Sequence, residues 1–513
     1  MATMIHLGCL ASLLPCHAQS SSEATQVPRV VHYEEFGAVG DGKTDDFEAL
    51  AKAHQHANAH GGSVRARDGA TYYLGGANLT IPIETDTDFG AARFIIDDTK
   101  LENPRAQVFR VVSRQQRTNL SGLKSLSKGQ SRLGFKLPGP CLIIVTDDRT
   151  KRFIRRGKNR NSGSAQSDVF LVDADGVVDP KTPIIWNYER VTRAECLPVD
   201  KEPLMLRGGT FTTIASTRET SAYHSRGISI ERSNVVIDGV RHLVQGEGKT
   251  GPPYRGFINI SRCSDVIIRN SVLSGRKTYS KIGSAGERVA MGSYDISLDR
   301  AVNVALINCS QTNDIMDRSR WGIMGSNFCK NLIFDRCELS RFDAHQGVTN
   351  GAIRNSTIGY MGIKLTGGGL FVVENTTVKS HEFIELRPDY GSTWDGDLVI
   401  VNCRLEAPPG NHTPVVLGGS NDSQHDFGYT CHLPRRIEID GLHIEDSGQP
   451  KSAKGPAIFA NFSPKFLTNR YKPPHPQVIT REVTSRRVST ASGKALRVSD
   501  NPHMFRGVRI KGH

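Results

Sequence analysis

Short runs of apolar, often β-branched residues recur along the chain between about residues 228 and 446. Each run leads into a turn residue and then a small residue, and the turn residues are Gly239, Asn270, Asn308, Arg336, Asn355, Asn375, Asn402 and Gly441. Alternation along a strand buries every second side chain, and an Asn side chain suits a turn because it bonds nearby backbone. The pattern therefore predicts short parallel strands that stack one above another.

The spacing of these turns sets the size of the repeating unit. The shortest intervals, from Arg336 to Asn355 and from Asn355 to Asn375, are 19 and 20 residues. An interval of this length is one compact coil of a solenoid, and longer intervals contain loop insertions. The small residues after the turns then share one position, and we expect an internal stack of Ser271, Cys309, Cys337, Ser356, Thr376 and Cys403. The fold class indicated is an all-β parallel β-helix.

A helix is predicted ahead of the coils. In the segment Phe36–Leu74, Thr44 precedes a helical stretch that reaches about Ala59 and stops at Gly61 and Gly62. Together with its Gly-Asp-Gly-Lys-Thr-Asp-Asp run, this segment resembles the N-terminal module of the pectate-lyase-like β-helix superfamily, which polygalacturonases, lyases and phage tailspikes share. The resemblance implies a right-handed parallel β-helix with an N-terminal capping α-helix that covers the open end of the first coil.

The chain divides into five predicted segments. Residues 1–19 contain a short apolar stretch followed by small residues, although without a basic start, and we interpret them as the signal peptide of a secreted or periplasmic protein. The other segments are the start of the β-helix with its capping helix (28–82), early coils with large insertions or a small lobe (83–204), the β-helix core (205–446) and a Pro-, Lys- and Arg-rich tail (447–513). No apolar run approaches the roughly 18 residues of a membrane-spanning helix, so we expect no membrane association.

The charge of the chain bears on its partner. The formal net charge is +13 and the pI about 9.3. Such a surface suits a polyanion, either nucleic acid or an acidic polysaccharide, or it is a solvated surface without a partner. No nucleic-acid-binding motif accompanies the charge, so we expect an acidic polysaccharide, no nucleic acid, and a monomer. The cysteines show no C-x-x-C spacing, which argues against a metal site.

Ionisable residues line up over successive coils. Alternation within the strands turns Lys364 outward, and on the next coil it turns Glu385 and Arg387 outward. His345 lies 19 residues before Lys364, and Glu385 lies 21 residues after it, which is about one coil each. Neighbouring coils are roughly 4.8 Å apart, so these side chains are predicted to form one continuous strip.

The residue types in this strip suit elimination from a uronic-acid polymer. That reaction needs a cation beside the carboxylate, a base for the C5 proton and an acid for the leaving oxygen. Arginine pairs with carboxylate in bidentate fashion, and a lysine among other cations becomes a usable base because its pKa falls. In the β-helix glycosaminoglycan and alginate lyases, which the chain resembles in pattern, a Lys and an Arg on adjacent coils serve as base and acid. Lys364 and Arg387 match that arrangement in type and approximate spacing.

Two sets of candidate residues follow from this pattern. The catalytic candidates are Lys364, Arg387, His345 and Glu385. The substrate-binding candidates, which include aromatic residues that could stack on sugar rings, are Arg341, Asp343, Arg320, Trp321, Asp389, Tyr390, Trp394 and Asn313. The function expected is a polysaccharide lyase, with chondroitin sulfate, dermatan sulfate or hyaluronan as the favoured substrate. No cofactor is expected, and a calcium ion that neutralises the substrate carboxylate stays an alternative.

Two other functions fit the same pattern. A polygalacturonase-like hydrolase uses two carboxyl groups roughly 6.5–9.5 Å apart, for which Asp343 and Glu385 are candidates. Thr312-Asn313-Asp314 and Gly362-Ile363-Lys364 are weak echoes of hydrolase motifs. The third interpretation is a non-enzymatic glycan-binding β-helix protein, in which the strip is a stabilising stack of charges.

Overall fold

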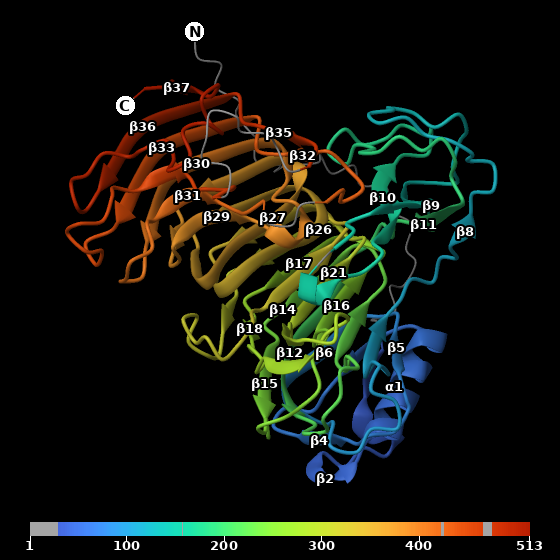
Figure 1. Cartoon of the computed structure of the whole chain (residues 1–513). Helices are drawn as coiled ribbons and strands as arrows, with labels where there is room; N and C mark the ends of the chain where they lie inside the picture. The colour runs from blue at the N-terminus through green and yellow to red at the C-terminus, as the bar shows by residue number, and fades with distance from the viewer. Residues whose placement is uncertain (1–28, 156, 422–424, 465–474, 513) are drawn as a thin grey trace, which may run out of the picture.

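The computed structural model describes residues 29–155, 157–421, 425–464 and 475–512. Its strands stack along one axis as a right-handed parallel β-helix, as the turn spacing predicts (Figure 1). The predicted signal peptide, residues 1–19, lies outside the described residues. In the described ranges, no helix is long and apolar enough to cross a membrane.

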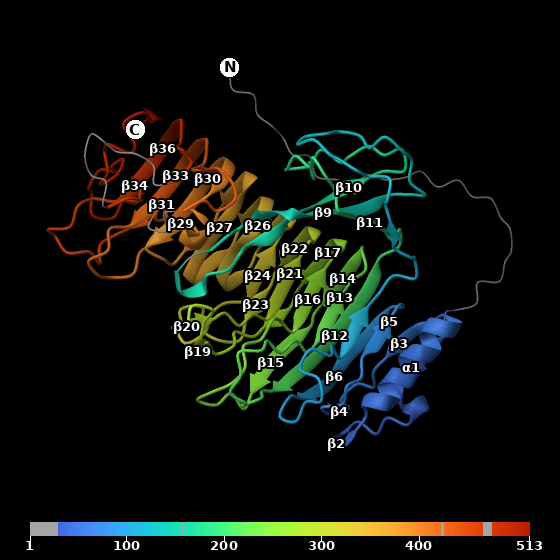
Figure 2. The same ribbon diagram turned by 45° about the vertical axis from the view of Figure 1, so that its right-hand side comes forward.

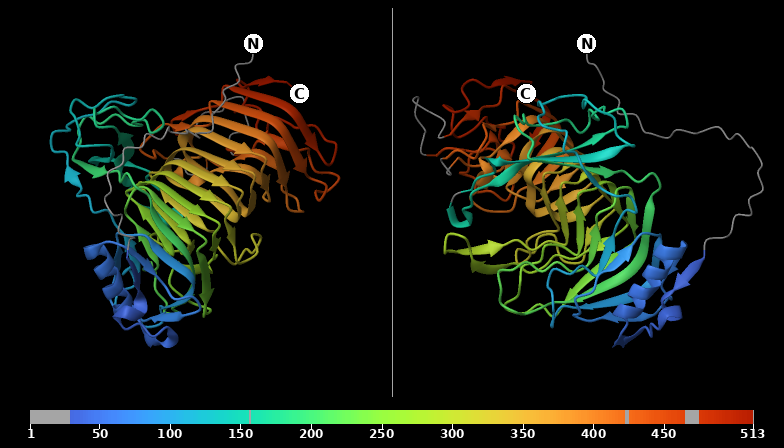
Figure 3. Two further views of the ribbon diagram at one scale, coloured as in Figure 1. Left: turned by 180° about the vertical axis from the view of Figure 1, so that it is seen from behind. Right: turned by 90° about the vertical axis from the view of Figure 1, so that its right-hand side faces the viewer.

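The coils build three rows of parallel strands (Figure 3). We call the rows A, B and C in the order in which each coil passes through them, so that the predicted turns lie between rows A and B. Row A contains β1 (Val30–His32), β3 (Ser63–Arg65), β14 (Val235–Asp238), β17 (Ser264–Arg269), β22 (Val302–Ile307), β25 (Lys330–Asp335) and β37 (Arg509–Lys511). Row B contains β2 (Asp41–Asp45), β4 (Thr71–Leu74), β15 (Arg241–Gln245), β18 (Val272–Leu273), β23 (Ser310–Gln311) and β28 (Thr377–Val378).

Row C contains β5 (Ile81–Ile83), β7 (Phe109–Val111), β13 (Ile228–Ile230), β16 (Ile258–Ser261), β21 (Ile296–Asp299), β24 (Met324–Asn327), β29 (Glu382–Leu386), β31 (Val415–Gly418) and β34 (Ala457–Phe459). Longer strands run through rows A and B: β6 (Thr87–Asp97), β12 (Leu204–Ile214), β30 (Trp394–Glu406), β33 (Arg436–Glu445) and β36 (Glu482–Thr490). Two strands, β26 (Glu338–Arg354) and β27 (Thr357–Glu374), bend through all three rows, so each is nearly one complete coil.

The predicted turn residues hold the corner between rows A and B. All of them have positive φ, from 48° at Asn375 to 81° at Gly441, which is the left-handed region that Asn and Gly tolerate best. Their side chains also bond from coil to coil, as between Asn308 and Asn270 at 2.8 Å. The small residues that follow are at most 5% exposed, so the predicted internal stack with its cysteines is confirmed.

The predicted helix is present as α1 (Phe47–His60). Its buried side chains, Phe47, Leu50, Ala53, His54 and Ala57, face the first strands at the N-terminal end of the solenoid (Figure 2). It begins later than Thr44 because residues 41–45 pair with β4 as strand β2, and the Asp46 carboxylate accepts hydrogen bonds from the backbone of Val39 and Gly40. That the helix covers the open end of the first coil stays a prediction.

A lobe, residues 118–198, is inserted between two coil strands, β7 and β12. It is a four-stranded antiparallel sheet of β8 (Thr118–Asn119), β9 (Cys141–Arg152), β10 (Ser164–Val172) and β11 (Arg193–Pro198) with an apolar core of its own. The lobe stands beside the middle of the solenoid (Figures 2 and 3). Residues 83–204 thus combine early coil strands with a lobe.

Beyond residue 446, where the composition suggests a tail, the solenoid continues. Strands β34, β36 and β37 pair in parallel with β31, β33 and β36. The smaller elements are a hairpin of β19 (Tyr279–Ile282) and β20 (Arg288–Met291), a pair of β32 (Cys431–His432) and β35 (Gln477–Val478), and the 3-10 turns η1 (Tyr33–Phe36), η2 (Gly157–Asn159) and η3 (Pro388–Tyr390).

Candidate functional site

Row C carries the predicted strip on its outer face. In the register of β26, β27 and β29, Asp343 pairs with Lys364, and Lys364 pairs with Glu385. The Lys364 ammonium forms an ion pair with the Glu385 carboxylate. His345 lies two residues beyond Asp343 on β26, and Arg387 lies two residues beyond Glu385, just after β29 ends. The spacing of 19 residues suggested that His345 lies beside Lys364 on the neighbouring coil. In the structure Asp343 occupies that place in the strip.

Asp343 is completely buried between two guanidinium groups. Its carboxylate lies 2.7 Å from Arg341 and 2.9 Å from Arg387, and Arg387 lies 2.9 Å from Asp389, which in turn lies 2.6 Å from Arg155 of the lobe. Burial acts to raise the pKa of Asp343, but the two arginines outweigh it and hold that pKa below its ordinary value. Burial likewise acts to lower the pKa of Arg387, and the two aspartates raise it instead. Arg387 is consequently a poor proton donor, and Asp343 is a poor general base.

His345 is held at both ring nitrogens. Its Nδ1 lies 2.8 Å from Oδ1 of Asn327, and its Nε2 lies 3.1 Å from the hydroxyl of Tyr390. Burial lowers the pKa of His345 to about 3, so the imidazole is neutral. Tyr390 is only 1% exposed and packs against Phe153 of the lobe. Its ring is therefore covered by protein and does not offer the stacking surface expected for a sugar.

Lys364 borders an open cavity of about 410 Å³. Glu382, His381, His412 and Asn461 line the same cavity. Burial lowers the pKa of Lys364 to about 8, against the attraction of Glu382. Burial raises the pKa of Glu382, against the attraction of Lys364. The cavity thus places a lysine that loses its proton near neutral pH beside a carboxyl group that keeps its proton to higher pH than usual.

Glu382 is a functional candidate that the sequence pattern did not single out. It begins strand β29 at the corner that leads into row C, where alternation says little about which way a side chain turns. A side chain at Gly418 on the next coil would overlap the Glu382 carboxylate, so that glycine leaves the room that Glu382 occupies. The available signal is a carboxylate three residues before Glu385 on the same short strand.

Neither predicted tryptophan lines this cavity. Trp394 is fully buried against Phe371, and its Nε1 donates a 3.0 Å hydrogen bond to the carbonyl of Gly369. The sugar-stacking role does not fit Trp394, because it begins strand β30 on an inward position instead of standing in a loop. The guanidinium of Arg341 lies over the ring of Trp321, 5.2 Å from its centroid.

Arg320 and Asn313 lie in the loops that follow row B. Arg320 is paired with Glu247 at 2.9 Å and also bonds the carbonyl of Gly275 at 2.8 Å. Oδ1 of Asn313 accepts a 2.8 Å hydrogen bond from the backbone of Gly275. Both predicted substrate-binding residues are therefore engaged in contacts that join the loops of neighbouring coils.

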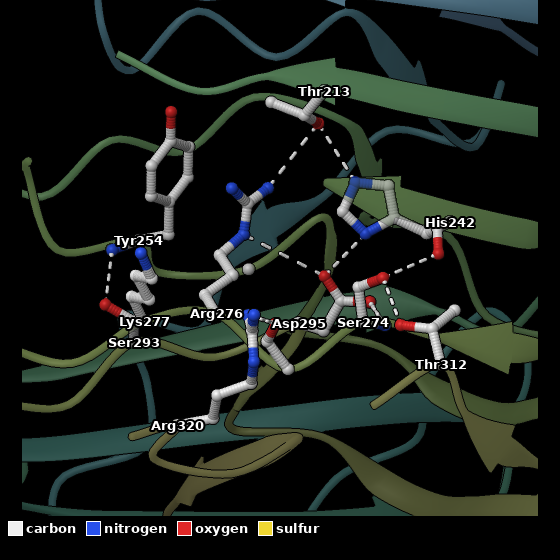
Figure 4. Close-up of polar contacts among 12 residues, drawn as sticks. Thr213, His242, Tyr254, Ser274, Arg276, Lys277, Ser293, Asp295, Thr312 and Arg320 are labelled. Carbon is white, nitrogen blue, oxygen red and sulfur yellow. Dashed lines mark hydrogen bonds and ion pairs between the residues drawn. The ribbon is translucent and has the colours of Figure 1, made fainter. Parts of the chain in front are cut away.

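A second polar cluster lies inside the solenoid (Figure 4). His242 bonds Asp295 at 2.7 Å through Nδ1 and the hydroxyl of Thr213 at 2.9 Å through Nε2. The order carboxylate, imidazole, hydroxyl is that of a catalytic triad, but all three side chains are completely buried. Arg276 adds its guanidinium 3.6 Å from the ring centre of Tyr254. Because substrate does not reach completely buried groups, we interpret this cluster as structural.

Comparison with known proteins gives the fold a context. No family profile matches the chain, and no curated protein sequence matches it. Among solved structures, it is similar to the tailspike gp61 of Pseudomonas phage phi297, with 14% identity and a TM-score of 0.53 over 90% of this chain and 81% of that one. The tailspike gp49 of Pseudomonas phage LKA1 is similar too, with 14% identity and a TM-score of 0.50 over the same shares. At this identity the likeness shows the β-helix fold alone.

Proposed function

We propose that the chain is a secreted lyase that cleaves an acidic, uronate-containing polysaccharide by β-elimination at the cavity beside Lys364. One observation carries the proposal. A lysine whose pKa lies at about 8 faces an open cavity together with a carboxyl group whose pKa is raised. A base and an acid with pKa values moved toward neutrality are what eliminative cleavage requires.

Each group has a part in the reaction. Neutral Lys364 takes the C5 proton of the uronate, and the electrons of that C–H bond form the double bond between C4 and C5. The bond from C4 to the glycosidic oxygen breaks, and protonated Glu382 supplies the proton to that oxygen. The Glu385 carboxylate contacts the Lys364 nitrogen and orients it by accepting a hydrogen bond from the amine. Arg387 keeps its charge and helps to lower the pKa of Lys364, so Glu382 replaces it as the acid.

The substrate carboxylate needs a cation, and we assign that role to Arg318. Arg318 is exposed, and its charge helps to lower the pKa of His381 in the cavity wall, whereas Arg341 and Arg387 are largely buried and paired with Asp343. With arginine in this role the reaction needs no calcium, and activity should persist in a chelator. The net charge of +13 favours a glycosaminoglycan such as chondroitin sulfate, dermatan sulfate or hyaluronan.

The test incubates the protein with chondroitin sulfate, dermatan sulfate, hyaluronan, alginate and polygalacturonate. Ultraviolet absorbance reports the unsaturated uronate product of a lyase, and a reducing-end assay reports all cleavage. Lys364→Ala and Lys364→Arg should both abolish turnover while leaving the thermal unfolding transition in place. Lys379→Ala is the matched control, because Lys379 lies on the next coil, is paired with Glu406 and does not line the cavity. Full activity in Lys364→Ala would overturn the proposal.

Glu382 also favours a second candidate function, glycoside hydrolysis. A carboxyl group with a raised pKa is the general acid of most glycosidases. Asp343, the carboxylate that the spacing suggested, is excluded from that role because two arginines bury and pair it. New reducing ends without ultraviolet absorbance would decide for hydrolysis, and binding without any cleavage would decide for a glycan-binding protein.

A further inference from the structure

A cleft of about 490 Å³ separates the lobe from the solenoid. The lobe contributes Arg152, Phe153 and Trp186 to one wall, and the solenoid contributes the backbone of β26 and β27 to the floor. Tyr429 and Arg435, from the segment that leads into β33, close one side. The cleft is distinct from the cavity beside Lys364, because no residue lines both.

The floor of the cleft is smooth because it is made of glycine. Gly367, Gly368 and Gly369 follow one another on β27. A Cβ atom at Gly368 would lie 2.5 Å from the carbonyl oxygen of Asp395, and one at Gly367 would overlap the carbonyl oxygen of Val348. No side chain therefore fits at these positions, and a ligand can approach the sheet backbone directly.

Aromatic rings form the upper wall. Trp186 and Tyr429 are partly exposed, with ring centroids 6.3 Å apart. The guanidinium of Arg152 lies 4.7 Å from the centre of the Trp186 ring and is itself fixed by Gln166 at 2.7 Å. Partly exposed aromatic rings beside polar groups are the surface on which the apolar face of a sugar ring packs, because they combine a large contact area with low mobility.

The charge of the cleft is unbalanced. Asp395 is the acidic residue of its lining, and three basic side chains surround that carboxylate: Lys128 at 3.3 Å, Arg435 at 3.7 Å and His432 at 3.8 Å. Among the described residues, Nδ1 of His432 is buried without a hydrogen-bond partner. One carboxylate cannot saturate the donors of two long cationic side chains, so the cleft keeps donors and positive charge for a ligand.

We propose that this cleft binds an anionic saccharide. The carboxylate or sulfate group of the sugar meets Lys128 and Arg435, its ring lies on Trp186, and the glycine floor admits the chain. Gly367 is three residues beyond Lys364 on β27, about 10 Å along the strand. Binding in the cleft involves the same class of ligand as the proposed cleavage at Lys364, but it does not depend on the catalytic step. Either proposal can therefore be refuted while the other stands.

The experiment measures binding to the full-length protein at fixed ionic strength. The probes are short chondroitin sulfate, polygalacturonate and cellulose oligosaccharides, which are sulfated and carboxylated, only carboxylated, and neutral. Binding is read as the change in tryptophan fluorescence and by calorimetry, in a Lys364→Ala background so that no cleavage occurs. Trp394 is fully buried, and Trp321 lies against Arg341 and does not line the cleft. The fluorescence change should therefore disappear in Trp186→Phe.

Two double variants separate the cleft from general attraction of polyanions. Lys128→Ala with Arg435→Ala removes the cleft cations. Lys136→Ala with Arg336→Ala removes two charges of similar exposure elsewhere, each already paired with one aspartate. The cleft variant should weaken binding of an anionic probe by about tenfold or more, the effect of losing a charge-assisted hydrogen bond. The control variant should weaken binding by less than about twofold, since exposed charges act weakly.

The outcomes divide cleanly. Equal losses in the two double variants would overturn the proposal in favour of general charge attraction, and unchanged binding in the cleft variant would overturn it as well. Tight binding of the neutral probe would contradict the anionic ligand class. A difference between the two anionic probes decides whether sulfate or carboxylate is the preferred group.

Discussion

Lys330 and Asp168 form a 2.7 Å ion pair in which neither side chain is more than 2% exposed. The pair joins strand β25 of the solenoid to strand β10 of the lobe. Asp168 also accepts hydrogen bonds from the backbone of Val169 and Ile185, both at 2.8 Å, so the buried carboxylate is fully satisfied. This contact holds the lobe against the solenoid together with other pairs, such as Arg262 with Glu195 at 2.7 Å.

Replacing only the lysine of this pair should be costly. Lys330→Met leaves the Asp168 charge buried without its partner, and we expect a loss of about 3–5 kcal/mol in the free energy of unfolding. Adding Asp168→Asn removes the stranded charge while keeping an oxygen acceptor, so the double variant should be more stable than Lys330→Met. Denaturant unfolding of both proteins checks the order, and a double variant no more stable than the single one would contradict it.

Replacing the buried carboxylate of Asp343 should destabilise the protein as much as replacing Lys330. Asp343→Asn removes the negative charge between the Arg341 and Arg387 guanidinium groups and leaves only Asp389 to pair with Arg387, and we expect a loss of about 3–5 kcal/mol. Asp175→Asn, at an exposed position of the lobe, is the control and should stay within about 0.5 kcal/mol of the parent protein. A stable Asp343→Asn protein would show that the charged network is not closed in solution.

The pKa of Lys364 predicts the pH dependence of any eliminative activity. Only the neutral amine accepts a proton, and its pKa lies at about 8. Because the step also needs protonated Glu382, kcat/KM should follow a bell-shaped pH profile, since kcat/KM reports the acid and the base of the free enzyme. In Glu382→Gln the falling limb should be lost, and the residual rate should rise with pH and level off above about 8. A residual rate of that variant that falls through this range, with initial rates measured on one uronate polymer, would rule out Lys364 as the base.

The positive φ of the turn residues between rows A and B predicts that glycine is less destabilising than alanine at these positions. Asn355 has φ 50° and bonds Asp335 on the preceding coil at 3.0 Å. Asn355→Ala removes the hydrogen bond and places a residue that disfavours the left-handed conformation at this position. It should lower the free energy of unfolding by about 1–2 kcal/mol. Asn355→Gly loses the bond but adopts the backbone freely, so it should cost less. Thermal unfolding of both variants gives the order, and an alanine variant as stable as the glycine one would refute the role of positive φ.

Acid should destabilise the solenoid through His54 of α1. Burial lowers the pKa of His54 to about 3, whereas the unfolded chain titrates near its ordinary value of 6.5. Between these values the unfolded state binds the extra proton, so stability falls as pH falls, by about 1.4 kcal/mol per pH unit for this group. His54→Phe should flatten the dependence of unfolding free energy on pH below about 6.5. An unchanged slope would mean that His54 is already accessible in the folded state.

Much of the fold was predictable from the sequence because it is encoded locally. Each coil repeats an apolar strand, a residue that tolerates positive φ and a small buried residue, and Asn308 with Cys309 shows how few positions are needed. The helix after Thr44 was equally local, since its acidic start and paired glycines mark its ends. The pairing of Lys364 with Glu385 followed from the same repeat, because one coil of twenty residues stacks directly on the next.

The tertiary structure decided which of these side chains remain free to act. The sequence pattern places Arg387, His345 and Tyr390 on the outer surface. In the structure the lobe hairpin with Arg155 and Phe153, more than 180 residues away in sequence, covers them. Burial, charge pairing and the resulting pKa shifts depend on every neighbour in space. The sequence therefore shows Glu382 only as a second carboxylate near Glu385, and it carries no signature of the cleft under Trp186. Local repetition determined the scaffold, and contacts between distant segments determined its chemistry.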